Sequence, residues 1–184
     1  FELYSVLHTR RIGATPVYDC SRFSESEGGS EELEDQCNDS KLNTTGIDMA
    51  FKFTQRGEST DFGAFATLEK DEDFTEGNNY YAFRTIHNAG KHRIGHMVTH
   101  ADKPFIDRQA TVNVVDYQYI SDSGLKIEHI NMFSNISGED SGLGSRTMAM
   151  YRPNNEWRYG SEIYYFSDDL NISDMGYLWR NNLL

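Results

Sequence analysis

Residues 46–70 read GIDMAFKFTQRGESTDFGAFATLEK, and this stretch decides the fold class. Apolar and polar residues alternate with a period of two on both sides of the turn-forming tripeptide Gly57-Glu58-Ser59. Because successive side chains of a strand point to opposite faces, the pattern predicts two strands, 47–55 and 61–69, each with one apolar and one polar face. So short a connection favours an antiparallel reversal, and the two strands therefore form a hairpin.

The alternation also predicts which residues share a face, because a register slip by one residue would invert a whole strand. One side of the sheet is expected to carry Ile47, Met49, Phe51, Phe62, Ala64, Ala66 and Leu68. That side would contact lipid in a membrane protein and a core in a soluble protein. The middle strands alternate less cleanly, since 92–100 and 125–133 mix histidine and asparagine into their apolar faces.

The remainder of 46–166 repeats the hairpin. Further tight connections occur at 88–91, 121–124 and 153–156, and residues of this kind form turns. The four predicted hairpins are 47–69, 80–100, 110–134 and 145–166, and the longer polar loops between them are 71–79, 101–109 and 135–144. In an up-and-down meander all short turns lie at one end of the sheet, an asymmetry typical of membrane-spanning barrels. We expect an all-β antiparallel meander of about eight to ten strands, forming a barrel or part of one.

Three segments lie outside this meander. Residues 2–12 alternate loosely and predict a first strand. Residues 13–45 are acidic and rich in turn formers, so we expect a long exposed acidic loop that cannot bury enough surface to fold. The tail from 167 is expected to be another long loop that returns into a strand. We expect one domain over 1–184, and a fragment of a longer chain, because the sequence opens without Met.

Composition restricts the function. The formal net charge is −12, with 17 Lys and Arg against 29 Asp and Glu. Such a surface repels nucleic acid and anionic lipid headgroups, so we expect neither as a partner. No apolar run reaches the roughly 20 residues of a membrane-spanning helix. A β-barrel remains possible, because its lipid-facing and interior residues alternate and the average is polar.

The two cysteines, Cys20 and Cys37, both lie in the acidic segment. A disulfide between them would fit an extracytoplasmic protein and would stabilise it by about 3 kcal/mol in the chain-entropy model. Two free surface thiols are the alternative. Glu31, Glu34 and Asp35 are the calcium candidates of this segment, but the DxDxDG spacing of a dedicated loop is missing, which favours a solvated acidic surface.

The sequence gives little support for a histidine metal site or for catalysis. His92, His96 and His100 are spaced by four, which on a strand separates neighbouring members by about 13 Å, too far for one ion. The sequence contains no nucleophile elbow, phosphate-binding glycine loop or HExxH motif, and we therefore predict no catalytic residue, no cofactor and no metal site. A hydrolase built on convergent carboxylates or a metal stays open as a third possibility.

Both ends of the chain resemble one bacterial family. The matching residues are His8-Thr9-Arg10-Arg11-Ile12-Gly13 and FSDDLNISDMGYLWRNN at 166–182, and Asp61-Phe62-Gly63 before a strand also suits the pattern. The family is of unknown function and joins an amino-terminal module similar to family-nine carbohydrate-binding domains to an outer-membrane barrel. The resemblance implies an internal piece of that barrel and transfers no site residue. The Cys20–Cys37 loop departs from the family pattern.

These observations give two functional hypotheses. The first is a non-enzymatic segment of an outer-membrane-type barrel that contacts lipid through apolar strand faces and serves passage or surface binding. The alternative is a soluble extracytoplasmic barrel or sandwich that binds a glycan or another ligand. In both cases the long acidic loops share one rim of the sheet, so we expect a cationic, metal-bridged or glycan ligand to engage that rim.

Overall fold

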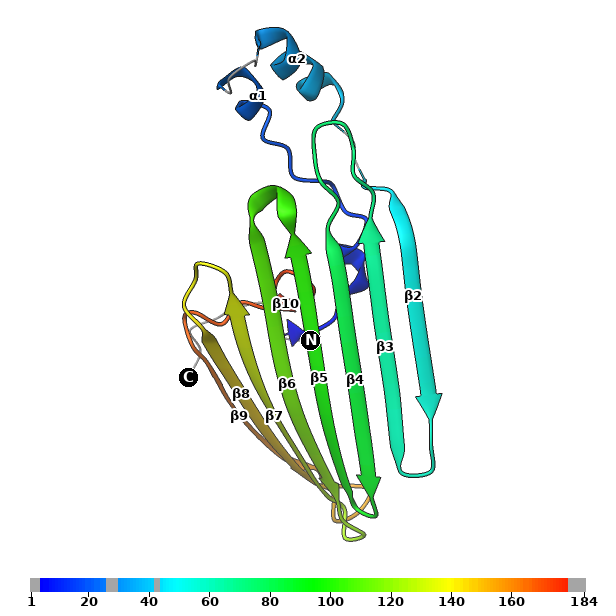
Figure 1. Ribbon diagram of the computed structural model, residues 1–184. Helices are drawn as coiled ribbons and strands as arrows, with labels where there is room; N and C mark the ends of the chain where they lie inside the picture. Colours follow the sequence, from blue (N-terminus) through cyan, green and yellow to red (C-terminus); the bar gives the residue numbers. More distant parts are fainter. Residues whose placement is uncertain (1–3, 26–29, 42–43, 179–184) are drawn as a thin grey trace.

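The computed structural model describes residues 4–25, 30–41 and 44–178, and an eight-stranded antiparallel sheet dominates it (Figure 1). The strands are β2 (Ile47–Arg56), β3 (Thr60–Glu69), β4 (Asn79–Ala89), β5 (His92–Lys103), β6 (Arg108–Ile120), β7 (Leu125–Ile136), β8 (Gly142–Tyr151) and β9 (Tyr159–Phe166). Each pairs with its sequence neighbours, which confirms the predicted antiparallel meander, although the chain is mostly β rather than all-β because it also contains helices. The predicted barrel is present only as an open sheet, because within the described residues β2 and β9 have no strand on their outer edges.

The predicted first strand over 2–12 is wrong apart from its start. Residues 2 and 3 lie outside the described residues, and of residues 4–12 only β1 (Tyr4–Ser5) is a strand, which pairs with β10 (Tyr177–Leu178) in a separate two-stranded sheet. Farther along the predicted strand, a 3-10 turn, η1 (Thr9–Arg11), interrupts the extended backbone. Without a neighbour in the main sheet, this segment has no ladder to sustain a long strand.

The strands run farther than predicted at one end of the sheet. The expected loop 101–109 shrinks to 104–107, which contains the 3-10 turn η2 (Pro104–Ile106), and the expected loop 135–144 shrinks to 137–141. Polar residues at the strand ends continue the ladder because backbone pairing does not require apolar side chains. Among the interhairpin loops only 70–78 keeps its predicted length, so the asymmetry between the two ends is weaker than expected.

The register assigns side chains to faces. Met49 lies opposite Leu68 and Phe51 opposite Ala66, and directly opposed residues share a face. The predicted shared face is therefore confirmed, with one exception. A register shift between Ile47 and Met49 sets Ile47 opposite Glu69, on the other side. We call the face that carries Phe51 the outer face and the opposite one the inner face.

The core lies on the inner face, under the two ends of the chain. Its central cluster consists of Val112, Val114, Met132, Phe166, Leu170 and Ile172. A second cluster joins Tyr80, Ala82 and Ala101 of the sheet to Met175 of the C-terminal segment. The soluble hypothesis placed a core on the opposite, more apolar face, and the structure corrects it. The terminal segments bring the missing apolar partners to the inner face.

Gly144 provides the space in which the C-terminal segment rests. A Cβ at this position would lie 2.8 Å from Leu170 Cδ2 and 3.0 Å from Met132 Cε. A Cβ at Gly142 would collide with the backbone of Leu170. The absence of side chains at these two strand positions allows the segment to approach the sheet backbone.

The acidic segment 13–45 is not the irregular loop that its composition predicted. It contains α1 (Arg22–Glu25) and α2 (Glu31–Asp39), which stand beyond the long-loop end of the sheet (Figure 1). Ser30 caps α2 by accepting a hydrogen bond from the Leu33 amide at 3.2 Å. The predicted disulfide joins Cys20 to Cys37 with Cα atoms 5.6 Å apart, and both cysteines are buried. Capping and the cross-link supply the order that the acidic composition opposes.

Candidate functional site

Charged residues of the strands gather on the inner face. The strand pairing places the following charged residues on this face: Lys52, Arg56, Asp61, Glu69, Arg84, Arg93, Lys103, Arg108, Asp116, Lys126, Glu128, Arg146 and Glu162. On the outer face, only Asp102 at the long-loop end of β5 carries a charge among the residues of regular register, histidine aside. The two faces of the sheet therefore differ sharply in charge.

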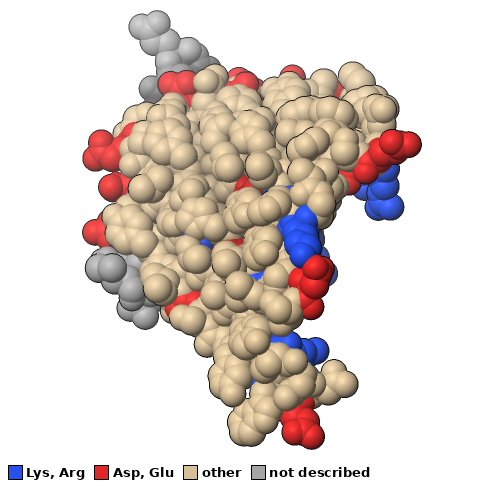
Figure 2. Space-filling model, turned by 90° about the horizontal axis from the view of Figure 1, so that it is seen from below, with Lys and Arg blue, Asp and Glu red and all other residues tan. Residues whose placement is uncertain are grey.

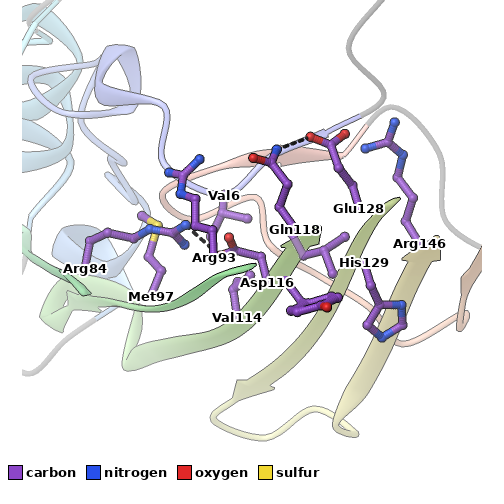
Figure 3. Close-up of a pocket in the computed structure, with 12 residues that line it drawn as sticks. Val6, Arg84, Arg93, Met97, Val114, Asp116, Gln118, Glu128, His129 and Arg146 are labelled. Atoms are coloured by element: carbon purple, nitrogen blue, oxygen red, sulfur yellow. Dashed lines mark hydrogen bonds and ion pairs between the residues drawn. The ribbon is translucent and has the colours of Figure 1, made fainter. Parts of the chain in front are cut away.

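A cavity of about 280 Å³ lies on the inner face, between Val6 and strands β4 to β8. We call it the polar hollow. The charged and amide side chains that line it are Arg84, Arg93, Asp116, Gln118, Glu128 and Arg146. Figure 3 shows these side chains on one side of the sheet, whereas His129 projects to the other side. The hollow is therefore a largely polar space bordered by strands and by the N-terminal segment.

An ion pair crosses three strands at one end of the hollow. Arg84 Nη2 on β4 lies 2.6 Å from Asp116 Oδ2 on β6. The strand between them carries Gly95, where an added Cβ would collide with both charged groups. Asp116 Oδ2 is buried without a hydrogen-bond partner, so this contact is a charge pair without hydrogen-bond geometry. The absence of a side chain at Gly95 is what allows the pair to form.

The other carboxylates around the hollow also have partners. Gln118 Nε2 donates a hydrogen bond of 2.7 Å to Glu128 Oε1, and Lys126 Nζ lies 2.6 Å from the same oxygen. Burial raises the pKa of Glu128, but the bonds from Lys126 and Gln118 outweigh it and hold the pKa below its usual range. Arg146 pairs with Glu162. Each carboxylate of the hollow thus already lies beside a basic partner.

A second network fixes the C-terminal segment at the long-loop end. Asp174 receives hydrogen bonds from Arg108 Nε at 3.0 Å and Nη2 at 2.9 Å, and Lys103 Nζ lies 2.7 Å away. Burial raises the pKa of Asp174, but the bonds from Arg108 and Lys103 prevail and lower it. The bonds that Arg108 donates to Asp174 and, to a lesser extent, to Glu139 raise the pKa of Arg108 against the opposing effect of burial. Bidentate pairing of this kind positions the segment over the inner face.

This network predicts a pH dependence of stability. Because the pKa of Asp174 is lowered on folding, its contribution is complete above the unfolded pKa of about 3.9 and is lost as pH falls through the lower folded value. We expect Asp174→Asn to lower the urea midpoint at pH 7, and the gap to the unmodified chain to shrink in increasingly acidic buffer. Asp140→Asn, at an exposed position, is the matched control. A gap that stays constant down to acid pH would contradict the assignment.

A second hollow lies at the long-loop rim. Its cavity of about 440 Å³ is lined by Phe23, Phe74 and Phe105 together with Arg22 and the acidic loop 71–76. Phe23 packs edge-on against Phe74 with ring centroids 5.2 Å apart, and the Arg22 guanidinium lies 5.2 Å from the Phe105 ring centroid. Thr75 donates a hydrogen bond of 2.8 Å to the Val17 carbonyl. These contacts join the disulfide-linked helices to the sheet.

The outer face exposes apolar and aromatic side chains across the sheet. They are Met49, Phe51, Phe53, Phe62, Tyr81, Phe83, Ile94, Val115, Phe133, Leu143, Tyr151, Tyr159, Ile163 and Tyr165. Seen from the short-turn end, most of the surface is neither acidic nor basic, and Lys and Arg atoms gather along one indented side (Figure 2). An exposed apolar surface of this extent is uncommon on a monomeric soluble protein.

Polar residues of the outer face largely satisfy one another. His129 Nδ1 lies 2.8 Å from Thr147 Oγ1, and its Nε2 lies 2.8 Å from Asn131 Nδ2. His92 Nδ1 lies 2.8 Å from the Tyr117 hydroxyl, and His100 Nδ1 lies 2.9 Å from Thr111 Oγ1. Each of these histidines therefore has a hydrogen-bond partner on the same face.

The predicted calcium candidates Glu31, Glu34 and Asp35 all lie on α2. No group of three or more His, Cys, Asp or Glu side chains within the described ranges has an arrangement that could hold a metal ion. His92, His96 and His100 share the outer face of β5. The polar hollow was missed by sequence reasoning, although a signal existed, since Arg84, Asp116 and Glu128 occupy the polar positions of alternating strands.

No helix in the described part of the chain is long and apolar enough to cross a membrane. Comparison with protein-family models, with curated proteins and with solved structures finds no match.

Proposed function

We propose that this chain is a non-enzymatic segment of an outer-membrane-type β-barrel, with its outer face against lipid and its inner face against an aqueous interior that serves passage or surface binding. One observation carries the proposal. Most of the exposed aromatic and aliphatic strand residues occupy the outer face, whereas all charged strand residues of regular register except Asp102 occupy the inner face. Transmembrane barrels have the same alternation of lipid-facing and interior residues.

Three further features support the proposal. Strand lengths of 8 to 13 residues bracket the roughly 9–11 residues that a tilted transmembrane strand needs. The Cys20–Cys37 disulfide is typical of an extracytoplasmic compartment. Residues 8–13 and 166–182 also resemble the bacterial family of unknown function that carries an outer-membrane barrel. The open edges of β2 and β9 are where further strands would complete such a barrel.

Spin labelling tests which face meets lipid. The native disulfide stays oxidised, so a label attaches only to an introduced cysteine, at Val115→Cys on the outer face or Gln118→Cys on the inner face. In vesicles, the label at 115 is expected to be more accessible to oxygen, and the label at 118 to a water-soluble nickel complex. The proposal would be overturned if the chain is monodisperse in water without detergent and does not bind to lipid vesicles.

A second candidate is a soluble extracytoplasmic sheet that binds a glycan or a cationic ligand at the long-loop rim. The observation that favours it is the rim hollow, where phenylalanine rings lie beside the carboxylates of 71–76. Aromatic faces stack on apolar sugar faces and attract cations, and clustered carboxylates attract cations at a distance. Behaviour as a soluble monomer together with binding abolished by Phe74→Ala would favour this candidate over the membrane proposal.

A further inference from the structure

The polar hollow contains one cation that its own carboxylates do not neutralise. Asp116 is paired with Arg84, Glu128 with Lys126, and Glu162 with Arg146. Arg93 also lines the cavity, but within the described residues no hydrogen bond or ion pair to its side chain occurs. In a chain of net charge −12, the unmatched group of this cavity is thus positive.

The surroundings of Arg93 leave its guanidinium available. Its backbone lies directly opposite Gln118 on β6, and the amide of Gln118 is directed to Glu128. In Figure 3 the Arg93 side chain rises from the sheet beside Val6, on the same side as Arg84 and Gln118. Arg93 is half-buried, so water screens its attraction to a bound anion only in part.

We infer that the polar hollow binds a small oxyanion, a carboxylate or phosphate group held by Arg93. A guanidinium presents a planar fork of donors that matches such groups in bidentate fashion. A free cation would meet carboxylates that already have partners, whereas an oxyanion meets an unpaired arginine. A volume of about 280 Å³ lies at the lower end of ligand cavities and suits a solute of about the size of a monosaccharide.

The position of the hollow determines the route of approach. Arg93 is the second residue of β5, next to the short turn at 90–91, whereas the acidic segments gather at the opposite, long-loop end. An anion is repelled by that rim and therefore enters from the short-turn end. This site differs in place and in sign from the cationic ligand expected at the rim, and it does not depend on whether the outer face meets lipid.

Calorimetric titration of the refolded, disulfide-intact chain in detergent tests the inference. The probes are glucuronate, inorganic phosphate and, as a neutral match, glucose. Arg93→Gln is expected to weaken glucuronate or phosphate binding by about tenfold or more. Arg158→Gln, which removes an exposed arginine outside the hollow, is expected to change nothing. Added salt is expected to weaken binding to the unmodified chain.

Each outcome is informative. Binding of glucuronate alone assigns a carboxylate ligand, and binding of both anions assigns a general oxyanion site. The inference is overturned if neither anion binds, if glucose binds as tightly, or if Arg93→Gln has no effect. If Arg93→Gln fails to fold, Arg93→Lys is used for the test instead. This substitution keeps the positive charge but removes the planar guanidinium that binds an oxyanion in bidentate fashion. An affinity below that of the unmodified chain supports the site, and an unchanged affinity overturns it.

Discussion

Phe51→Arg is expected to reduce the stability of the lipid-inserted chain by about 2–4 kcal/mol, the cost of a cation on the lipid face of a barrel near the bilayer midplane. Phe51 lies on the outer face of β2 and is 55% exposed, so the folded chain alone offers it little burial. In water, a substitution at so exposed a position changes stability by at most about 0.5 kcal/mol. The size of the effect thus reports the environment of the outer face.

Thr54→Arg is the matched control, because Thr54 lies on the inner face of the same strand and is also exposed. We expect it to be nearly neutral in vesicles. The measurement is the free energy of unfolding in urea, in lipid vesicles and in detergent-free buffer. Equal effects of the two substitutions in vesicles would show that the outer face is not the one in contact with lipid.

Phe166→Ala is expected to destabilise the chain by about 3–5 kcal/mol, as for other fully buried aromatic residues. Phe166 is 1% exposed and packs in the inner-face cluster that receives Leu170 and Ile172. The cavity left by the ring lies beside Gly144, which has no side chain to fill it. The C-terminal segment would lose its principal support on the last strand.

Urea unfolding measures this loss, with Tyr165→Ala as the control on the neighbouring residue. Tyr165 is 43% exposed on the outer face, so its truncation is expected to cost less than that of Phe166 in detergent. A loss for Tyr165→Ala as large as that for Phe166→Ala would show that the inner-face cluster is not the principal core.

The strands were predictable because their signal is local. Phe62, Ala64, Ala66 and Leu68 recur at every second position over one strand length, and short runs of turn-forming residues separate the strands of each hairpin. The loop lengths were not predictable in the same way, since Asp102 and Lys103 appear as loop residues by composition and yet pair in the ladder. Backbone hydrogen bonding determines where a strand ends. The polarity of the side chains is therefore only an indirect indicator of the strand boundary.

The position of the core and the polar hollow depend on contacts between distant parts of the chain. The apolar alternation of Met49 and Phe51 indicates an apolar face, but it does not distinguish lipid from a protein core. The actual core needs Leu170 and Ile172, which follow the last strand of the main sheet. The pair between Arg84 and Asp116 crosses an intervening strand at Gly95. For α2, by contrast, Ser30 followed by an acidic first turn was a readable capping signal.

The two-stranded sheet β1–β10 has a consequence for the order of folding. It joins Tyr4 to Leu178, and closing so long a loop in an unfolded chain costs more entropy than closing any hairpin. Every pairing in the main sheet is between chain neighbours, so hairpins can form first and zip together at low cost. The assembled sheet then holds β1 and β10 near each other. Their pairing is therefore expected to form last, when closing the long loop costs much less entropy than in the unfolded chain.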